Sequence, residues 1–157
     1  MKETVMVSID ASTKATGIAI WVNGKLTGHH LINFSNVKNM EDRLYQMCKN
    51  IIEILDTFKP SITYIEDTYV GRNPDTQKQL NRIKGVVFGW CIMNDSYFET
   101  MTPSSWRKYI SGFPSTRKRD ELKAYSVEYV KKYYGIDCTD DVADAILIGE
   151  AMLNKYE

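Results

Sequence analysis

The sequence predicts an α/β fold, a five-stranded mixed sheet flanked by helices, in which three antiparallel strands come first and two parallel strands follow. Two changes in the apolar pattern predict it. Residues 4–34 alternate apolar and polar side chains and contain an Asn23-Gly24 pair, which is typical of a tight hairpin turn. After residue 40 the apolar period lengthens to about 3.6, and short apolar segments at 61–66 and 97–101 alternate with helical ones. Helical crossovers favour parallel pairing of the strands that they connect.

Capping residues and stop signals mark the helices. The apolar stripe over residues 40–58 stops at Lys59-Pro60, and Asn73-Pro74 predicts the start of a helix that runs to about residue 93. Its two glycines, Gly85 and Gly89, are expected to pack closely on the sheet, because glycine otherwise costs about 1 kcal/mol in a helix. Farther along the chain, Thr102-Pro103 predicts the start of another helix. Ser115 or Thr116 is expected to cap the next helix, which Gly135 ends, and the last helix is expected to begin at Thr139.

Composition predicts one compact domain that covers residues 1–157. Of the 157 residues 43% are apolar, and 20 Lys and Arg balance 20 Asp and Glu, as in an average globular protein. No apolar run approaches the roughly 20 residues of a membrane span, and the N-terminus is too polar for a signal peptide. We therefore expect a soluble protein of the cytoplasm, in a bacterial cell or a phage-infected host, with no membrane partner.

The cysteines and histidines exclude several classes of site. Cys48, Cys91 and Cys138 are odd in number and widely spaced, so they indicate neither a disulfide framework nor a zinc site. The two histidines, His29 and His30, lie side by side in an expected strand, which leaves few candidate bases for a Ser or Cys nucleophile. Any catalysis is therefore expected to use carboxylates, lysines or a metal.

Charge is distributed unevenly along the chain. Residues 72–132 carry 12 Lys and Arg against 6 Asp and Glu, a local charge of +6, whereas the remainder has 8 against 14, or −6. A basic middle beside acidic segments suits a polyanion held against a cation site, although solvated helix faces would give the same pattern.

Two acidic residues come at the ends of strands that are expected to be parallel neighbours. Asp10 ends the first strand and Glu66 the fourth, so both carboxylates are expected at the carboxyl edge of the sheet, where α/β folds bind ligands. Asp67 could serve in place of Glu66, because the sequence does not settle which residue faces the site. Taken alone, Asp10 could simply cap a turn and Glu66 could be a solvated strand end.

The last expected helix contributes two more carboxylates. Asp141 and Asp144 are three residues apart and project from one face. The helix dipole alone also favours acidic residues in the first helical turn, where Asp140 and Asp141 lie. Asp144 lies farther on, among apolar residues, where a carboxylate needs a partner. Four clustered carboxylates repel one another unless cations neutralise them, and all-oxygen ligands suit Mg²⁺ or Mn²⁺. Two such ions can promote in-line phosphoryl displacement without a histidine.

In these segments the chain resembles the RuvC-type Holliday junction resolvases of the ribonuclease H-like nuclease superfamily. The resemblance covers nearly the whole length and rests on Ile9-Asp10 followed by Thr16-Gly17, on Ile65-Glu66, and on the acidic pattern of residues 141–145. It implies a ribonuclease H-like fold and a homodimer that cuts two opposed strands of a four-way DNA junction. It also implies that the catalytic metal ligands are Asp10, Glu66, Asp141 and Asp144.

The resemblance further implies DNA contacts. Tyr69 matches an aromatic residue of the family that stacks at the junction centre. Arg107 and Lys118 are the best matches to the basic residues that hold the scissile strand. Lys118 is also a catalytic candidate. The other expected DNA contacts are Arg72, Lys108, Arg117 and Arg119. The chain departs from the family at Ala11, where Pro followed by Gly is usual, and in having Arg rather than Lys near position 107. Such divergence fits a phage-encoded member.

The predicted function is a structure-selective, Mg²⁺-dependent endonuclease, with two ions per site, that leaves 5′-phosphate and 3′-hydroxyl ends. One alternative is an RNA-directed nuclease of the same superfamily, acting on RNA–DNA hybrids or in rRNA processing, because the sheet and carboxylates would look alike. Another is a nucleic-acid binding module without catalytic activity, against which the four intact acids argue.

Overall fold

The computed structural model describes residues 2–67 and 73–157. Its elements alternate along the chain as the sequence predicts. In chain order they are β1 (Val5–Asp10), β2 (Ala15–Val22), β3 (Lys25–Asn33), α1 (Met40–Phe58), β4 (Ile62–Glu66), α2 (Pro74–Met93), β5 (Tyr97–Met101), α3 (Pro103–Arg107), α4 (Arg119–Tyr134) and α5 (Asp140–Lys155).

The five strands form one mixed sheet in the order β3-β2-β1-β4-β5. β1 pairs antiparallel with β2, and β2 with β3, whereas β4 pairs parallel with β1 and β5 parallel with β4. The Asn23-Gly24 pair forms the hairpin turn between β2 and β3, where both residues have positive φ. The predicted mixed sheet is confirmed, and β1 lies near its centre.

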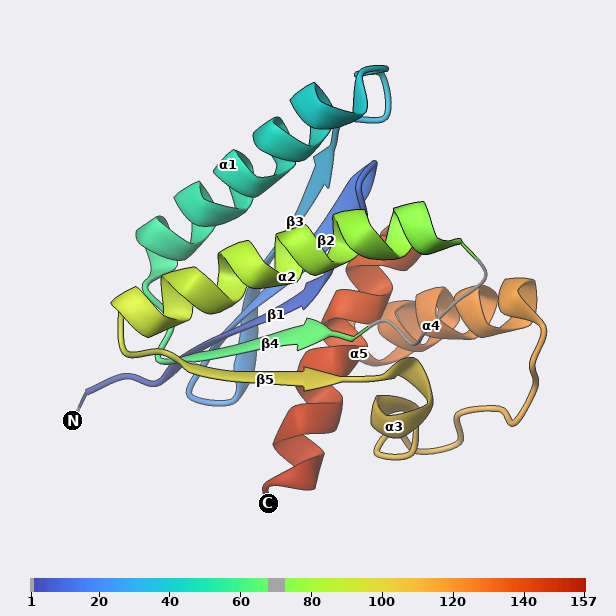
Figure 1. The fold of residues 1–157 in the computed structure, drawn as a ribbon. Coiled ribbons are helices and arrows are strands. Elements are labelled where there is room, and N and C mark those ends of the chain that lie inside the picture. Colours follow the sequence, from blue (N-terminus) through green and yellow to red (C-terminus); the bar gives the residue numbers. More distant parts are fainter. Residues whose placement is uncertain (1, 68–72) are drawn as a thin grey trace.

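Helices cover both faces of the sheet (Figure 1). One apolar core lies between the sheet and α1 with α2, and a second lies between the sheet and α5, with α3 and α4 packed around it. α5 approaches the sheet very closely at Gly149, where an added Cβ would overlap the Trp21 indole. The Ser8 hydroxyl fixes this contact by donating to the Ala145 carbonyl at 2.7 Å.

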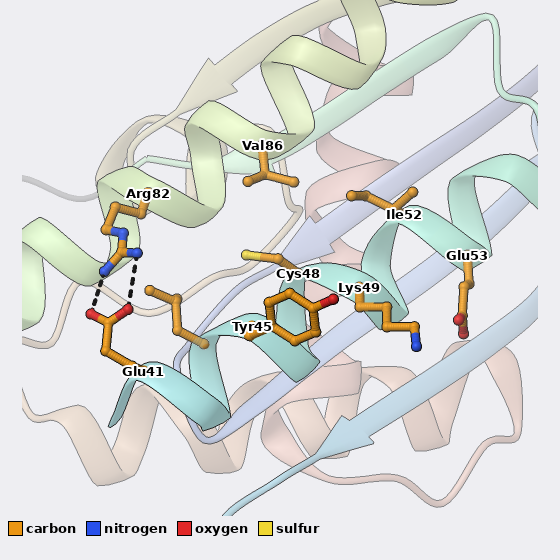
Figure 2. A pocket seen from close by; sticks show the side chains of 9 residues that line it. Glu41, Tyr45, Cys48, Lys49, Ile52, Glu53, Arg82 and Val86 are labelled. Atoms are coloured by element: carbon orange, nitrogen blue, oxygen red, sulfur yellow. Dashed lines mark hydrogen bonds and ion pairs between the residues drawn. The ribbon is translucent and has the colours of Figure 1, made fainter. Parts of the chain in front are cut away.

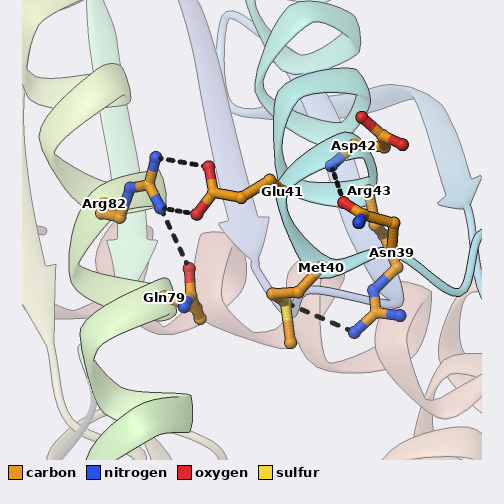
Figure 3. Close-up of polar contacts among 7 residues, drawn as sticks. All are labelled: Asn39, Met40, Glu41, Asp42, Arg43, Gln79 and Arg82. Carbon is orange, nitrogen blue, oxygen red and sulfur yellow. Dashed lines mark hydrogen bonds and ion pairs between the residues drawn. The ribbon is translucent and has the colours of Figure 1, made fainter.

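The caps of the main helices follow the sequence signals with one exception. Asn39, Asn73 and Thr139 accept hydrogen bonds from the first turns of α1, α2 and α5; Figure 3 shows the Asn39 cap on Asp42. The prediction of a cap at Ser115 or Thr116 is wrong. α4 begins at Arg119 with Lys118 at its cap position, because the Thr116 hydroxyl accepts from the Lys118 backbone N–H at 3.1 Å and prolongs the loop.

The expected role of the glycines in α2 is also wrong. In the part of the chain that the structure describes, nothing lies within 4 Å of a Cβ added at Gly85 or Gly89, so neither glycine serves a close contact with the sheet. Ile83, Val87 and Trp90 form the buried face of α2 instead. The glycines lie on the outward side of the helix, beside the exposed side chains of Phe88 and Ile92.

α1 and α2 are joined at one end by an ion pair. Arg82 of α2 donates to both carboxylate oxygens of Glu41 of α1, at 2.7 and 3.2 Å (Figure 3). Among the helices that the structure describes, none has the length and apolar character needed to cross a bilayer.

Candidate active site

Two carboxylates meet where the central parallel strands end. β1 and β4 are paired in parallel with Ile9 opposite Ile65, so the next position in this register places Asp10 level with Glu66. Adjacent strands lie about 4.8 Å apart. Residues one step back, Ile9 and Ile65, belong to the core under α1 and α2. Since side chains alternate between faces, Asp10 and Glu66 project toward the α5 face.

Gly17 brings the first turn of α5 to this edge. It pairs with Asp10 across β1 and β2, and an added Cβ would overlap the backbone carbonyl of Asp141. Only glycine therefore lets the helix backbone rest on β2 at this point. The sequence resemblance marked the Thr16-Gly17 pair but gave no physical reason for it. Its role is to place Asp141 and Asp144 beside the two strand ends.

The turn after Asp10 is held by side chains. Ser12 Oγ donates to the Ala15 carbonyl at 2.5 Å and accepts from the Ala15 N–H at 3.0 Å. Thr16 Oγ1 in turn accepts from the Ser12 N–H at 3.3 Å and donates to the Ser12 carbonyl at 3.1 Å. The chain therefore turns after Asp10 without the Pro-Gly pair that its sequence lacks at Ala11.

The four carboxylates lie close enough to shift one another's pKa. Burial raises the pKa of Asp10 well above its usual value, and repulsion from Glu66, Asp144 and Asp141 raises it further. Burial, with Asp144 nearby, raises the pKa of Glu66 to about 7, although the Trp106 hydrogen bond and Arg107 oppose this. Burial likewise raises the pKa of Asp144 to about 6 and, with Asp140, raises the pKa of Asp141. The structure thus brings together the four acids that the sequence singled out.

The donor set of this cluster fits a hard divalent cation. Asp144 Oδ1 is buried and, within the described residues, has no hydrogen-bond partner. A buried carboxylate oxygen without a donor is costly, and a cation would satisfy it. All four side chains offer oxygen, which Mg²⁺ and Mn²⁺ prefer. Within residues 2–67 and 73–157, no three Asp, Glu, His or Cys side chains lie close enough together to hold an ion in their present conformations. Binding of an ion therefore requires side-chain rotation.

These pKa shifts predict how the metal-free protein responds to pH. The unfolded chain loses its carboxyl protons near pH 4, whereas folded Asp144 and Glu66 keep theirs until about pH 6 and 7. The folded state binds more protons in between, so the free energy of unfolding falls as the pH rises from about 4 to 7. We expect the metal-free Tm to drop by several degrees between pH 5 and 8, with a smaller drop in Asp144→Asn. Added Mg²⁺ should raise the Tm more at pH 8 than at pH 5. A metal-free Tm that climbs steadily over this range would contradict the assignment.

Arg107 is a predicted DNA contact that lies close enough to the carboxylates to act on them. It is half-buried in α3 and lowers the pKa of both Glu66 and Asp144. Its guanidinium carbon is 5.3 Å from the ring centroid of Trp106 and 5.5 Å from that of Phe113. No salt bridge joins Arg107 to an acid among the described residues, so it is available to an incoming anion.

The other predicted DNA contacts lie farther out. The Lys118 side chain is 80% exposed and, among the described residues, pairs with Glu121 at 3.8 Å, so the structure does not bring this catalytic candidate into the carboxylate cluster. Arg119 is exposed but near enough to lower the pKa of Asp141. Arg117 is exposed, and Lys108 lines a cavity of about 380 Å³ beside Arg107. Tyr69 and Arg72 lie outside the described residues.

Three supporting residues escaped sequence reasoning. Trp106 donates its indole N–H to Glu66 Oε2 at 2.6 Å, and a hydrogen bond from Ser126 lowers the pKa of Asp144. Lys84 of α2 forms an ion pair with Asp67, which lies past the end of β4, whereas Glu66 is the strand-end acid that raises the pKa of Asp10. In the sequence, the one sign of these supporting residues was a tryptophan next to the basic Arg107. The hydrogen-bond partner of that tryptophan could not be predicted, because it depends on how α3 packs.

A family model described as crossover junction endodeoxyribonuclease RuvC matches residues 6–150 of the chain. The chain belongs to the RuvC family. Curated RuvC proteins from Dictyoglomus turgidum and Carboxydothermus hydrogenoformans are 22% and 28% identical to it, with alignments that cover 98% and 93% of both chains. Membership in this family confirms the predicted class of enzyme, a Holliday junction resolvase with endodeoxyribonuclease activity.

Solved RuvC structures share the fold. Thermus thermophilus RuvC in complex with a Holliday junction substrate superposes with a TM-score of 0.75 at 14% identity, covering 98% of this chain and 94% of that one. Fowlpox virus resolvase in complex with Holliday junction DNA gives 0.64 at 12% identity, covering 98% of this chain and 99% of that one. These similarities confirm the predicted RuvC-like α/β architecture.

Proposed function

We propose that residues 1–157 form one nuclease domain that resolves four-way DNA junctions as a homodimer, with Asp10, Glu66, Asp141 and Asp144 as ligands of two divalent ions. Mg²⁺ is the preferred ion, and Mn²⁺ can replace it. One observation carries the metal assignment: four carboxylates from β1, β4 and α5 repel one another at a single sheet edge, and one of their buried oxygens has no donor within residues 2–67 and 73–157.

The residues around the cluster have distinct roles in this proposal. Bound ions would supply an activated water and neutralise charge on the scissile phosphate. Arg107, held over Trp106 and Phe113, offsets the negative charge that develops on that phosphate. Asp10 and Glu66 lie on paired strands of the sheet, so the backbone positions from which their carboxylates project are set before DNA binds. The resulting ends are a 5′-phosphate and a 3′-hydroxyl.

The exposed basic residues bind the DNA backbone. These residues follow one another from the end of α3, through the loop after it, to the start of α4: Lys108, Arg117, Lys118 and Arg119. This route begins at Arg107, beside the carboxylates, and stays exposed, as backbone contacts require. Lys118 keeps its proposed role as a phosphate contact, and Arg107 takes the position next to the reaction. Tyr69 and Arg72 remain predicted junction contacts.

The outward face of α2 is the proposed dimer contact. Phe88, Ile92 and Met93 are 49%, 63% and 85% exposed, an unusual apolar group for a surface, and Gly85 and Gly89 leave room for a second backbone. An open groove of about 520 Å³ lies beside it between α1 and α2, with Cys48, Ile52 and Val86 on its walls (Figure 2). A two-fold pairing of this face would present two active sites to the two strands that must be cut.

A charge on this face should separate the protomers. We expect Ile92→Glu to sediment as a monomer at concentrations where the wild-type chain is a dimer, because the carboxylate would be buried in the apolar contact. Tyr133→Glu on α4 is the control, since Tyr133 is similarly exposed, at 61%. A monomeric wild-type protein, or an Ile92→Glu variant that stays dimeric, would contradict the proposed contact.

Labelled substrates test the function directly. The protein is incubated with a mobile four-way junction, a flap, a linear duplex and an RNA–DNA hybrid, each with Mg²⁺ and with EDTA. The proposal predicts paired cuts in the junction that need Mg²⁺. Preference for the hybrid would favour the RNA-directed alternative, since that specificity depends on the 2′-hydroxyl. Junction binding without any cut in Mg²⁺ or Mn²⁺ would favour a silent binding module.

A further inference from the structure

A buried tryptophan holds one of the four carboxylates. Trp106 is fully buried, and its indole N–H donates to Glu66 Oε2 at 2.6 Å. The indole nitrogen is a donor only, so this hydrogen bond has one possible direction. It occupies Oε2 and ties the orientation of the carboxylate to that of the indole.

The tryptophan is itself tightly fixed. Its backbone N–H donates to the Thr102 carbonyl at 3.1 Å, in a single-turn helix that Pro103 opens. Its ring packs into the core under α5 and meets Phe113 edge to face, with centroids 5.7 Å apart. Glu66 therefore takes its orientation from a side chain with no freedom to follow it.

The Trp106 ring also contacts a cationic side chain. The Arg107 guanidinium carbon lies 5.3 Å from the Trp106 ring centroid, within the range of a cation–π contact. One face of the indole thus supports Arg107 while its edge holds Glu66. The spacing between the carboxylate and the arginine is consequently set by one rigid side chain.

We propose that Trp106 is a positioning residue, which presets Glu66 for a divalent ion and fixes Arg107 beside it. This inference rests on the proposed function, because it assumes that Glu66 is a metal ligand. Groups that hydrogen-bond to a ligand and fix its orientation raise metal affinity, and their loss weakens binding about 10–100-fold.

The chain contains a matched control pair. Trp90 donates its indole N–H to Asp56 Oδ1 at 2.8 Å and is also buried, but it lies in the core under α1 and α2. Trp90→Phe removes the same chemical group from the same kind of bond, away from the four carboxylates. Trp106→Phe keeps an aromatic ring under Arg107 and removes the donor to Glu66 together with one ring of the buried indole, a loss of volume that Trp90→Phe shares.

Calorimetric titration with Mn²⁺, without DNA, measures the effect. We expect Trp106→Phe to weaken Mn²⁺ binding about tenfold or more and Trp90→Phe to leave it unchanged. In junction cleavage, Trp106→Phe should need correspondingly more Mg²⁺ for half-maximal rate and recover much of the wild-type kcat at saturating Mg²⁺, with the KM for DNA little changed. A folded Trp106→Phe protein with wild-type Mn²⁺ affinity would overturn the proposal.

A second measurement uses the unmodified protein, so it does not depend on the folding of a variant. The chain has three tryptophans and hence three indole N–H signals in a ¹H–¹⁵N spectrum. Mg²⁺ should shift the Trp106 signal and leave those of Trp21 and Trp90 in place. An unmoved Trp106 signal in protein that binds Mg²⁺ and cuts junctions would overturn this inference alone, whereas absence of metal binding by the wild-type protein would overturn the proposed function with it.

Discussion

We expect Asp144→Asn to abolish junction cleavage and to leave junction binding in place. Asp144 contributes a buried oxygen with no hydrogen-bond partner among the described residues, and it repels Asp10. A neutral amide of the same shape removes the charge that would hold the cation. Loss of one such electrostatic contact typically slows the chemical step 10²–10³-fold, and loss of a metal ligand should cost at least about 10³-fold.

Single-turnover cleavage and gel-shift binding of the same labelled junction separate the two effects. Asp140→Asn is the matched control, because Asp140 lies one turn away on α5 and pairs with Lys123 at 3.2 Å. That variant should cut at close to the wild-type rate. Full cleavage by Asp144→Asn would defeat the metal assignment.

Gly17→Ala should damage both the fold and the reaction. Its methyl group would overlap the backbone carbonyl of Asp141, which cannot move aside as a flexible side chain could. The first turn of α5 would have to shift, and overpacking of this kind costs about 1–3 kcal/mol of stability. A displacement of about 1 Å of Asp141 and Asp144 from the strand ends could slow cleavage about 10²-fold.

Denaturant unfolding and cleavage at saturating Mg²⁺ measure these two losses. Gly28→Ala is the control: a Cβ there meets only Ile20 side-chain atoms, at 3.9 Å, so both properties should stay near wild type. If Gly17→Ala were as stable and active as Gly28→Ala, the close approach of α5 to β2 would not be what assembles the site.

The sequence was sufficient to predict the sheet, and to place candidate acids at its carboxyl edge and on one side of the last helix, because these features depend on local patterns. Alternation, the Asn23-Gly24 turn and helical crossovers determine which strands pair, and the pairing determines that Asp10 and Glu66 share an edge. The spacing of Asp141 and Asp144 places both on one side of α5. Each of these inferences needs only the periods of strand and helix.

The remaining features depend on contacts between elements far apart in sequence. Trp106 and Glu66 are 40 residues apart, and nothing near either residue indicates that they meet. Gly85 and Gly89 were expected to face the sheet, but their outward position follows from which side of α2 carries Ile83 and Val87. The start of α4 was misplaced because Thr116 bonds within the loop instead of capping a helix.

Paramagnetic broadening by Mn²⁺ tests most directly whether the four acids form one metal centre. In ¹⁵N-labelled protein at substoichiometric Mn²⁺, the backbone amide signals of Asp10, Glu66, Asp141 and Asp144 should broaden together and first. Exposed acids elsewhere, such as Glu41 and Asp137, should be unaffected at that concentration. Broadening that begins at those surface acids, or that reaches only one of the four, would contradict a shared site.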